Sequence, residues 1–209
     1  MTARKKDPLT RGSFSSTLPA MRDVFVQGLE TLRFMAWPEP FEFWRASEGS
    51  DPHWRGIARE RGFETWEDWR RSYVPHFRME ERRWTLYRVV DPLLTVPGFR
   101  GGPFQGWIEK TYRDAGISPT FEVIAGRLTE VQNGYVAKLK ASYPKETTVI
   151  GVQTDDGVII AEGTHRCCAI AQAAAEGLPI ATDFRIALGS YLPGSLPMIQ
   201  KVYKGVDSI

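Results

Sequence analysis

Apolar residues recur at helical spacing in the first part of the chain. Between residues 19 and 35 this spacing predicts an amphipathic helix. A further helix is expected after Asp51, because Asp is a favoured N-cap and Pro52 suits the first helical position. Residues 1–17 are polar and rich in Ser, Gly and Pro, so we expect a loose tail there.

The second part of the chain alternates between short apolar runs and helical patterns. The apolar runs predict strands over residues 84–90, 147–152, 158–161 and 180–188. The helical patterns predict helices over residues 128–143, 164–175 and 196–203. Asp156 and Gly157 are a strong hairpin-turn pair between the second and third strands.

Composition narrows the classes of protein to consider. The chain has 209 residues, 42% of them hydrophobic, and a formal net charge of +2. This length suits one domain, or a core of about 125 residues with a smaller extension. The charge is too balanced to indicate nucleic-acid binding by bulk electrostatics. No apolar run approaches the ~18 residues that span a membrane. The only cysteines, Cys167 and Cys168, are adjacent, which disfavours a disulfide framework and a zinc site, so we expect a cytoplasmic protein.

One short stretch carries most of the candidate chemistry. The third predicted strand is followed by Glu162, Gly163, Thr164, His165 and Arg166, which open the next helix. A helix N-terminus presents unpaired N–H groups and a partial positive charge, so it can seat a phosphate. Arg166 can grip phosphate with two parallel hydrogen bonds, and Gly163 lets a ligand approach the backbone. Thr164 is expected as the N-cap.

This stretch and its surroundings resemble the ParB/sulfiredoxin superfamily. Residues 158–169 read Val-Ile-Ile-Ala-Glu-Gly-Thr-His-Arg-Cys-Cys-Ala and fit each slot of that family's motif. The resemblance covers residues 84–188 and includes the order strand–helix–strand–strand–helix–strand. It implies an α+β fold with a mixed sheet and flanking helices over residues 84–209. Residues 1–83 would then be a tail and a helical extension rich in Trp and Arg.

The resemblance also implies that Gly163, Thr164, His165 and Arg166 hold nucleotide phosphates. Thr164 stands where sulfiredoxin has its reactive Cys, so sulfiredoxin chemistry is not expected. About 20 residues follow the last predicted strand, too few for the DNA-binding domain of partition proteins. The free-serine kinases of the family have an Asp where this chain has Glu162, and their phosphate-facing Arg corresponds to Arg166.

We therefore expect a nucleotide-binding protein that transfers or hydrolyses a phosphoryl group, with Glu162, His165 and Arg166 as catalytic residues. ATP or ADP is the favoured nucleotide, with Mg²⁺ as a companion ion and an unidentified acceptor. Glu162 would act as a base or bind magnesium, or else it orients Arg166 through an ion pair. Two alternatives stay open: a protein that binds or cleaves DNA, and a catalytically silent interaction module.

Two further segments have a functional and a structural interpretation. Residues 53–88 contain nine arginines and four tryptophans, which suits nucleic-acid binding, but six acidic residues lie among them. We therefore expect this segment to cover the core, with Trp66 and Trp69 on one face of a helix that Thr65 caps. The Gly/Pro-rich connection over residues 97–106 is either an exposed loop or a binding loop. In the second case the ligand contacts would be Phe99, Arg100, Phe104 and Gln105.

Overall fold

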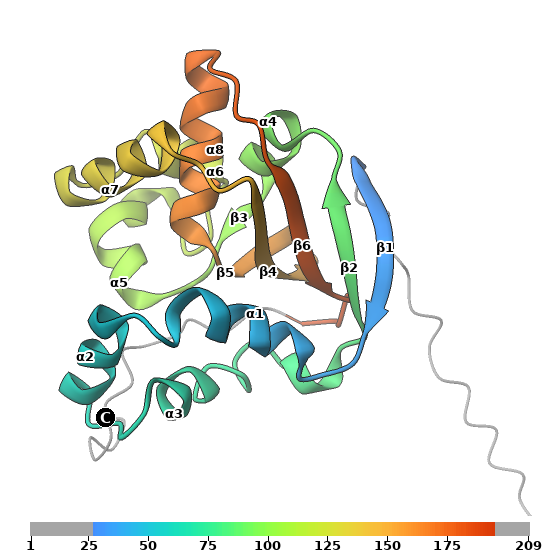
Figure 1. The fold of residues 1–209 in the computed structure, drawn as a ribbon, viewed down its shortest axis with the longest axis vertical. Helices are drawn as coiled ribbons and strands as arrows, with labels where there is room; N and C mark the ends of the chain where they lie inside the picture. Colours follow the sequence, from blue (N-terminus) through green and yellow to red (C-terminus); the bar gives the residue numbers. More distant parts are fainter. Residues whose placement is uncertain (1–26, 195–209) are drawn as a thin grey trace, which may run out of the picture.

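The computed structural model describes residues 27–194, which form a mixed six-stranded sheet with helices on both faces (Figure 1). The strand order across the sheet is β1-β2-β6-β4-β5-β3. The strands are β1 (Leu29–Met35), β2 (Trp84–Val89), β3 (Arg100–Gly101), β4 (Glu146–Thr154), β5 (Gly157–Glu162) and β6 (Asp183–Gly189). The pairs β4–β6 and β3–β5 are parallel and the others are antiparallel. This arrangement confirms the expected α+β class.

Eight α-helices flank the sheet within the described residues. They are α1 (Glu39–Glu48), α2 (Pro52–Glu60), α3 (Trp66–Arg71), α4 (Pro92–Thr95), α5 (Gln105–Trp107), α6 (Phe121–Ala125), α7 (Glu130–Ala141) and α8 (Thr164–Glu176). Shorter turns are η1 (Met79–Glu81), η2 (Val96–Gly98), the π-helical η3 (Ile108–Tyr112) and η4 (Arg113–Ala115). Helices α1–α3 lie on one side of the sheet, and α6–α8 lie on the other (Figure 1).

Each face of the sheet has its own hydrophobic core. Val158 and Ile160 of β5 belong to the cluster beneath α6–α8, whereas Ile159 and Ala161 belong to the cluster beneath α1–α3. This alternation is the two-residue period of a strand. Because helices cover both faces, the strand is apolar at successive positions instead of alternating with polar residues.

Local signals in the sequence explain several element boundaries. Asp51 caps α2 by accepting a hydrogen bond from the backbone N–H of His53 at 2.8 Å. Thr65 caps α3 through the N–H of Asp68 at 3.0 Å. The structure also confirms the predicted hairpin turn at Asp156 and Gly157, which joins β4 to β5, and the helix predicted over residues 164–175, which is α8. Gly177 ends α8 in the left-handed conformation, with φ of 67°, which glycine adopts at little cost.

The prediction of one helix over residues 19–35 is wrong for its described part. Residues 29–35 form the edge strand β1, which pairs antiparallel with β2 from Leu29–Val89 to Met35–Trp84. A register shift between Thr31 and Arg33 interrupts the regular alternation of the strand. The buried and half-buried apolar side chains therefore lie three residues apart, which is also a helical spacing.

The N-terminal segment is thus not helical throughout, because it contributes β1 to the sheet before α1–α3 cover one face. The boundary expected between residues 83 and 84 stays a prediction. The tail predicted over residues 1–17, the start of the helix predicted over residues 19–35 and the helix predicted over residues 196–203 lie outside the described residues.

Candidate functional site

The candidate phosphate-binding turn lies directly between β5 and α8. Gly163 is the N-cap of α8 and has a φ of 100°. A Cβ at this position would lie 2.4 Å from Cγ1 of Val149, so the turn requires glycine for both conformation and space. Thr164 is the first helical residue instead of the expected N-cap, and no side chain caps α8. The backbone N–H groups of the first turn are thus not covered by a capping side chain.

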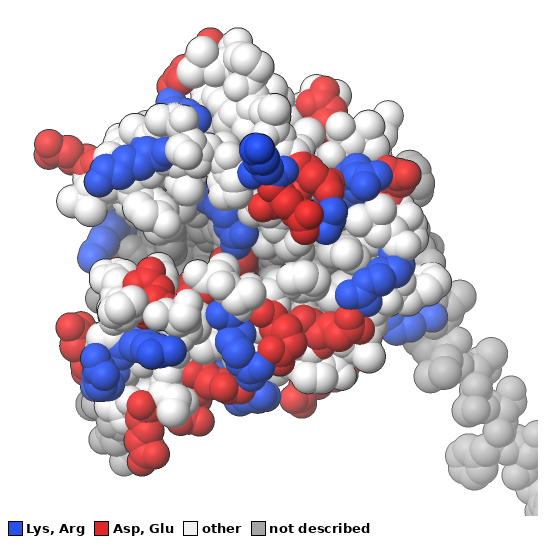
Figure 2. All heavy atoms as spheres, in the orientation of Figure 1, with Lys and Arg blue, Asp and Glu red and all other residues white. Residues whose placement is uncertain are grey.

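A cavity of about 470 Å³ lies in front of this turn. One wall comes from the N-terminal segment and includes Trp44, Ser47, Glu48, Trp54, Arg70 and Tyr73. The opposite wall includes residues 162–166, together with Phe104, Trp107, Lys110, Gln132 and Tyr135. Figure 2 shows the surface hollowed between the part formed by α1–α3 and the part formed by α5 and α7. All five candidate site residues of the motif line this cavity.

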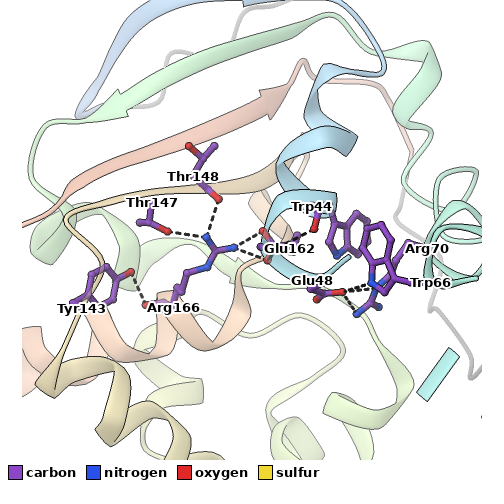
Figure 3. Close-up of polar contacts among 10 residues, drawn as sticks. Trp44, Glu48, Trp66, Arg70, Tyr143, Thr147, Thr148, Glu162 and Arg166 are labelled. Atoms are coloured by element: carbon purple, nitrogen blue, oxygen red, sulfur yellow. Dashed lines mark hydrogen bonds and ion pairs between the residues drawn. The ribbon is translucent and has the colours of Figure 1, made fainter. Parts of the chain in front are cut away.

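Arg166 turns its guanidinium towards the sheet. Its Nη2 donates to both carboxylate oxygens of Glu162 at 2.5 Å. Its Nη1 donates to Oγ1 of Thr147 at 2.7 Å and to the carbonyl oxygen of Thr148 at 3.0 Å (Figure 3). The structure therefore brings Glu162 and Arg166 together as an ion pair, which was the alternative expected for Glu162 beside the roles of base and magnesium ligand. In this arrangement both terminal nitrogens of the guanidinium donate to protein oxygens, so the expected grip of Arg166 on phosphate through two parallel hydrogen bonds is not formed by these nitrogens.

Glu162 is buried and has a second polar neighbour. Its Oε1 lies 3.1 Å from the hydroxyl oxygen of Ser47, which comes from α1. Burial raises the pKa of the Glu162 carboxyl, and Glu48 raises it further, while Arg166 and Ser47 act in the opposite direction. The carboxylate is therefore held by Arg166, four residues away in the sequence, and by Ser47, 115 residues away.

A second ion pair lies on the N-terminal wall of the cavity. Arg70 contacts a carboxylate oxygen of Glu48 at 2.5 Å, and the same oxygen accepts a hydrogen bond from Nε1 of Trp66 at 3.0 Å (Figure 3). The Arg70 guanidinium carbon also lies 3.8 Å from the ring centroid of Trp69. The sequence pattern did not identify Glu48 or Ser47 as site residues. Both belong to α1, whose sequence contains no recognisable binding or catalytic motif.

His165 packs against two aromatic rings. Its ring centroid is 5.1 Å from that of Trp107 and 4.9 Å from that of Tyr135. Burial lowers the pKa of His165 to about 4. The imidazole is therefore neutral at neutral pH and offers one N–H donor and one nitrogen acceptor instead of a positive charge.

Cys167 and Cys168 are buried inside α8, as a packing role requires. Burial raises the pKa of both thiols far above the neutral range. They therefore stay protonated and face the core, and neither lines the cavity.

The Gly/Pro-rich connection is divided between the core and the cavity. Phe104 and Gln105 line the cavity, as the binding-loop interpretation requires. Phe99 is buried in the core, and Arg100 donates to the carbonyl oxygens of Asp156 and Ser118. Lys110 follows this connection and also lines the cavity, but no motif identified it in the sequence.

The described residues contain neither a cluster of metal ligands nor a helix that could span a membrane. Within residues 27–194, no group of three or more His, Cys, Asp or Glu side chains is placed to hold a metal ion. None of the helices that the structure describes is long and apolar enough to cross a membrane.

No protein-family model, curated protein or solved structure matches this chain. The resemblance to the ParB/sulfiredoxin superfamily therefore stays a prediction.

Proposed function

We propose that the cavity binds a nucleotide, with its phosphates at the N-terminus of α8 and its base against the aromatic side chains. The observation that carries this proposal is the composition of the cavity wall. A helix N-terminus, several cations and several aromatic rings face one space of about 470 Å³. This volume lies within the range of small-molecule sites, and aromatic walls with a few polar groups are typical of them.

The charges of the cavity favour an anionic ligand. Four cationic side chains and two carboxylates line it, namely Arg61, Arg70, Lys110, Arg166, Glu48 and Glu162. Both carboxylates are already paired with arginines. A cleft with an excess of positive charge concentrates anions, and the first-turn N–H groups of α8 add donors at one end.

The same pairing limits how magnesium can bind. Glu48 and Glu162 are each committed to an arginine, so neither offers a free carboxylate in the described arrangement. Mg²⁺ prefers oxygen ligands and usually keeps several waters. In this proposal the phosphates of the nucleotide would supply most of the ligands of the ion, because residues 27–194 offer no group of three or more acidic, His or Cys side chains for it.

The proposed chemistry is phosphoryl transfer or hydrolysis within a fold of the ParB/sulfiredoxin type. The order from β2 through α7, β4, β5 and α8 to β6 supports this fold. Glu162 holds Arg166 at the edge of the site and is placed to accept a proton. Neutral His165 donates a hydrogen bond to a phosphate oxygen, and positioning with charge stabilisation supplies the catalysis.

A thermal-shift and calorimetric comparison of ATP, ADP, CTP and GTP, each with and without Mg²⁺, tests this proposal. At a concentration of about 100 times Kd, a bound nucleotide stabilises the chain by about 2.7 kcal/mol. That corresponds to a rise in Tm of roughly 5–10 °C for a chain of this size. No stabilisation by any of the four nucleotides would contradict the proposal.

Two matched lysine variants locate the site. Lys110→Ala removes a cation from the cavity wall and is expected to weaken nucleotide binding about tenfold. Lys138→Ala removes an exposed cation of α7 that does not line the cavity. The nucleotide affinity of Lys138→Ala is expected to equal that of the wild type. If both variants weakened nucleotide binding equally, the nucleotide would bind outside this cavity.

A further inference from the structure

The hydroxyl group of Ser47 occupies an unusual position in the cavity. Ser47 lies near the end of α1 and lines the cavity wall. Its Oγ is 3.1 Å from Oε1 of Glu162 and 3.1 Å from the carbonyl oxygen of Trp44. A hydroxyl beside a carboxylate at the edge of a phosphate site is the arrangement that an acceptor and its general base require.

We propose that Ser47 is a phosphoryl acceptor, so that the chain phosphorylates itself from a nucleoside triphosphate bound in the cavity. This inference rests on the proposed function. A lone pair of Ser47 Oγ forms a bond to the terminal phosphorus, and the bond from that phosphorus to the bridging oxygen breaks. The electron pair of the broken bond stays on the nucleoside diphosphate. The hydroxyl proton passes to Oε1 of Glu162.

The position of Glu162 in the chain supports this geometry. It is the last residue of β5 and directly precedes Gly163 and the first turn of α8. The carboxylate beside Ser47 is therefore adjacent to the N–H groups that would hold the phosphates. Arg166 keeps the carboxylate in place, and burial raises the pKa of Glu162, which makes it a better proton acceptor than an exposed carboxylate.

The other hydroxyl groups of the cavity are less suited to this role. The Tyr73 hydroxyl accepts hydrogen bonds from Nε1 of Trp69 at 3.0 Å and from Arg61 at 2.9 Å. Thr164 belongs to the turn that would hold the phosphates, and Tyr135 packs its ring against His165. Among the cavity hydroxyls within the described residues, Ser47 is the one that contacts a carboxylate.

The test is incubation of the full chain with ATP, GTP or CTP and Mg²⁺, followed by intact-mass measurement and site mapping. We expect the addition of one phosphoryl group at Ser47, at a rate independent of protein concentration because the reaction is intramolecular. Ser47→Ala should abolish the addition. Ser50→Ala should retain it, because Ser50 is exposed and does not line the cavity.

Glu162→Gln removes the proton acceptor and should slow the reaction about 10²–10⁴-fold. Ser47→Thr keeps a hydroxyl at the same position and should retain part of the reaction, which separates chemistry from a folding defect. A nucleotide that raises Tm without any phosphorylation would overturn this inference and leave the proposed function intact. Phosphorylation that maps elsewhere or survives in Ser47→Ala would overturn it as well. If no nucleotide binds, the proposed function fails and this inference fails with it.

Discussion

The ion pair between Glu162 and Arg166 gives the sharpest test of how the site is held together. The Glu162 side chain is 6% exposed and that of Arg166 is 17% exposed. Arg166→Met keeps much of the side-chain volume but leaves the Glu162 carboxylate buried without its cation. Removal of one partner of a buried pair costs about 3–5 kcal/mol, because the remaining charge is uncompensated. For a chain of this size the expected fall in Tm is roughly 6–20 °C.

The measurement is urea unfolding followed by circular dichroism, with three variants compared. Arg127→Met is the matched control, because Arg127 pairs with Asp114 on the surface and exposed pairs contribute little. The double variant Arg166→Met with Glu162→Leu should recover most of the loss, because apolar residues of similar volume replace buried pairs at little cost. A loss below about 1 kcal/mol in Arg166→Met would refute the reasoning.

The pH dependence of the same variant supplies a second check. Without Arg166, the pKa of Glu162 rises further, because burial then acts without the opposing cation. An acid whose pKa is higher in the folded chain binds its proton more tightly there. Stability then falls as pH rises from the unfolded pKa to the folded pKa. The deficit of Arg166→Met should therefore be smaller near about pH 5 than near about pH 8, and equal deficits would contradict this explanation.

Three further predictions concern the turn and its helix. Gly163→Ala should destabilise the chain by more than about 1 kcal/mol in urea unfolding, because Gly163 has a positive φ and its added Cβ would overlap Val149. The control Gly134→Ala should stabilise the chain by up to about 1 kcal/mol, because Gly134 lies in α7 with open space around it. Cys167→Ala and Cys168→Ala should each keep nucleotide affinity and lose about 1 kcal/mol of stability, and thiol labelling should stay slow until the chain unfolds. His165 should show no change of charge between about pH 5.5 and 8 by NMR, because its pKa lies near 4, and a titration in that range would contradict its burial.

The half of the site formed by β5 and α8 could be predicted because its signals are local. A hairpin turn, an apolar strand, a glycine and a run of small helical residues follow one another within about 20 positions. Gly163 was expected to allow a ligand close approach, and the structure shows that the turn also requires it. The direction of Arg166 could not be read locally, because it depends on the threonines of β4.

The opposite wall could not be predicted, because its parts meet only in the folded chain. Ser47 reaches Glu162 across 115 residues, and the pair of Glu48 with Arg70 joins α1 to the end of α3. No sequence pattern links these positions. The edge strand β1 was missed for a related reason, since its irregular register gives the apolar positions a spacing that also fits a helix.

The packing of residues 53–88 leads to a final prediction, on DNA. Trp66, Trp69 and Trp84 are buried in the core beneath the sheet, so their rings cannot stack on bases in this arrangement. Arg71 pairs with Glu67 at 3.2 Å, and Figure 2 shows basic and acidic side chains interspersed on the visible face.

Few phosphates could then be neutralised, so binding to single-stranded or duplex DNA should be weak and should vanish at moderate salt. Fluorescence anisotropy over a salt series measures this, with Arg59→Ala and Arg71→Ala as probes of the exposed cations. Micromolar affinity that persists at physiological salt, and that falls in these variants, would favour the DNA-binding alternative over a nucleotide site. Weak DNA binding is compatible with a nucleotide site, because the cavity is lined by Trp44, Trp54 and Trp107, whereas Trp66, Trp69 and Trp84 pack in the core.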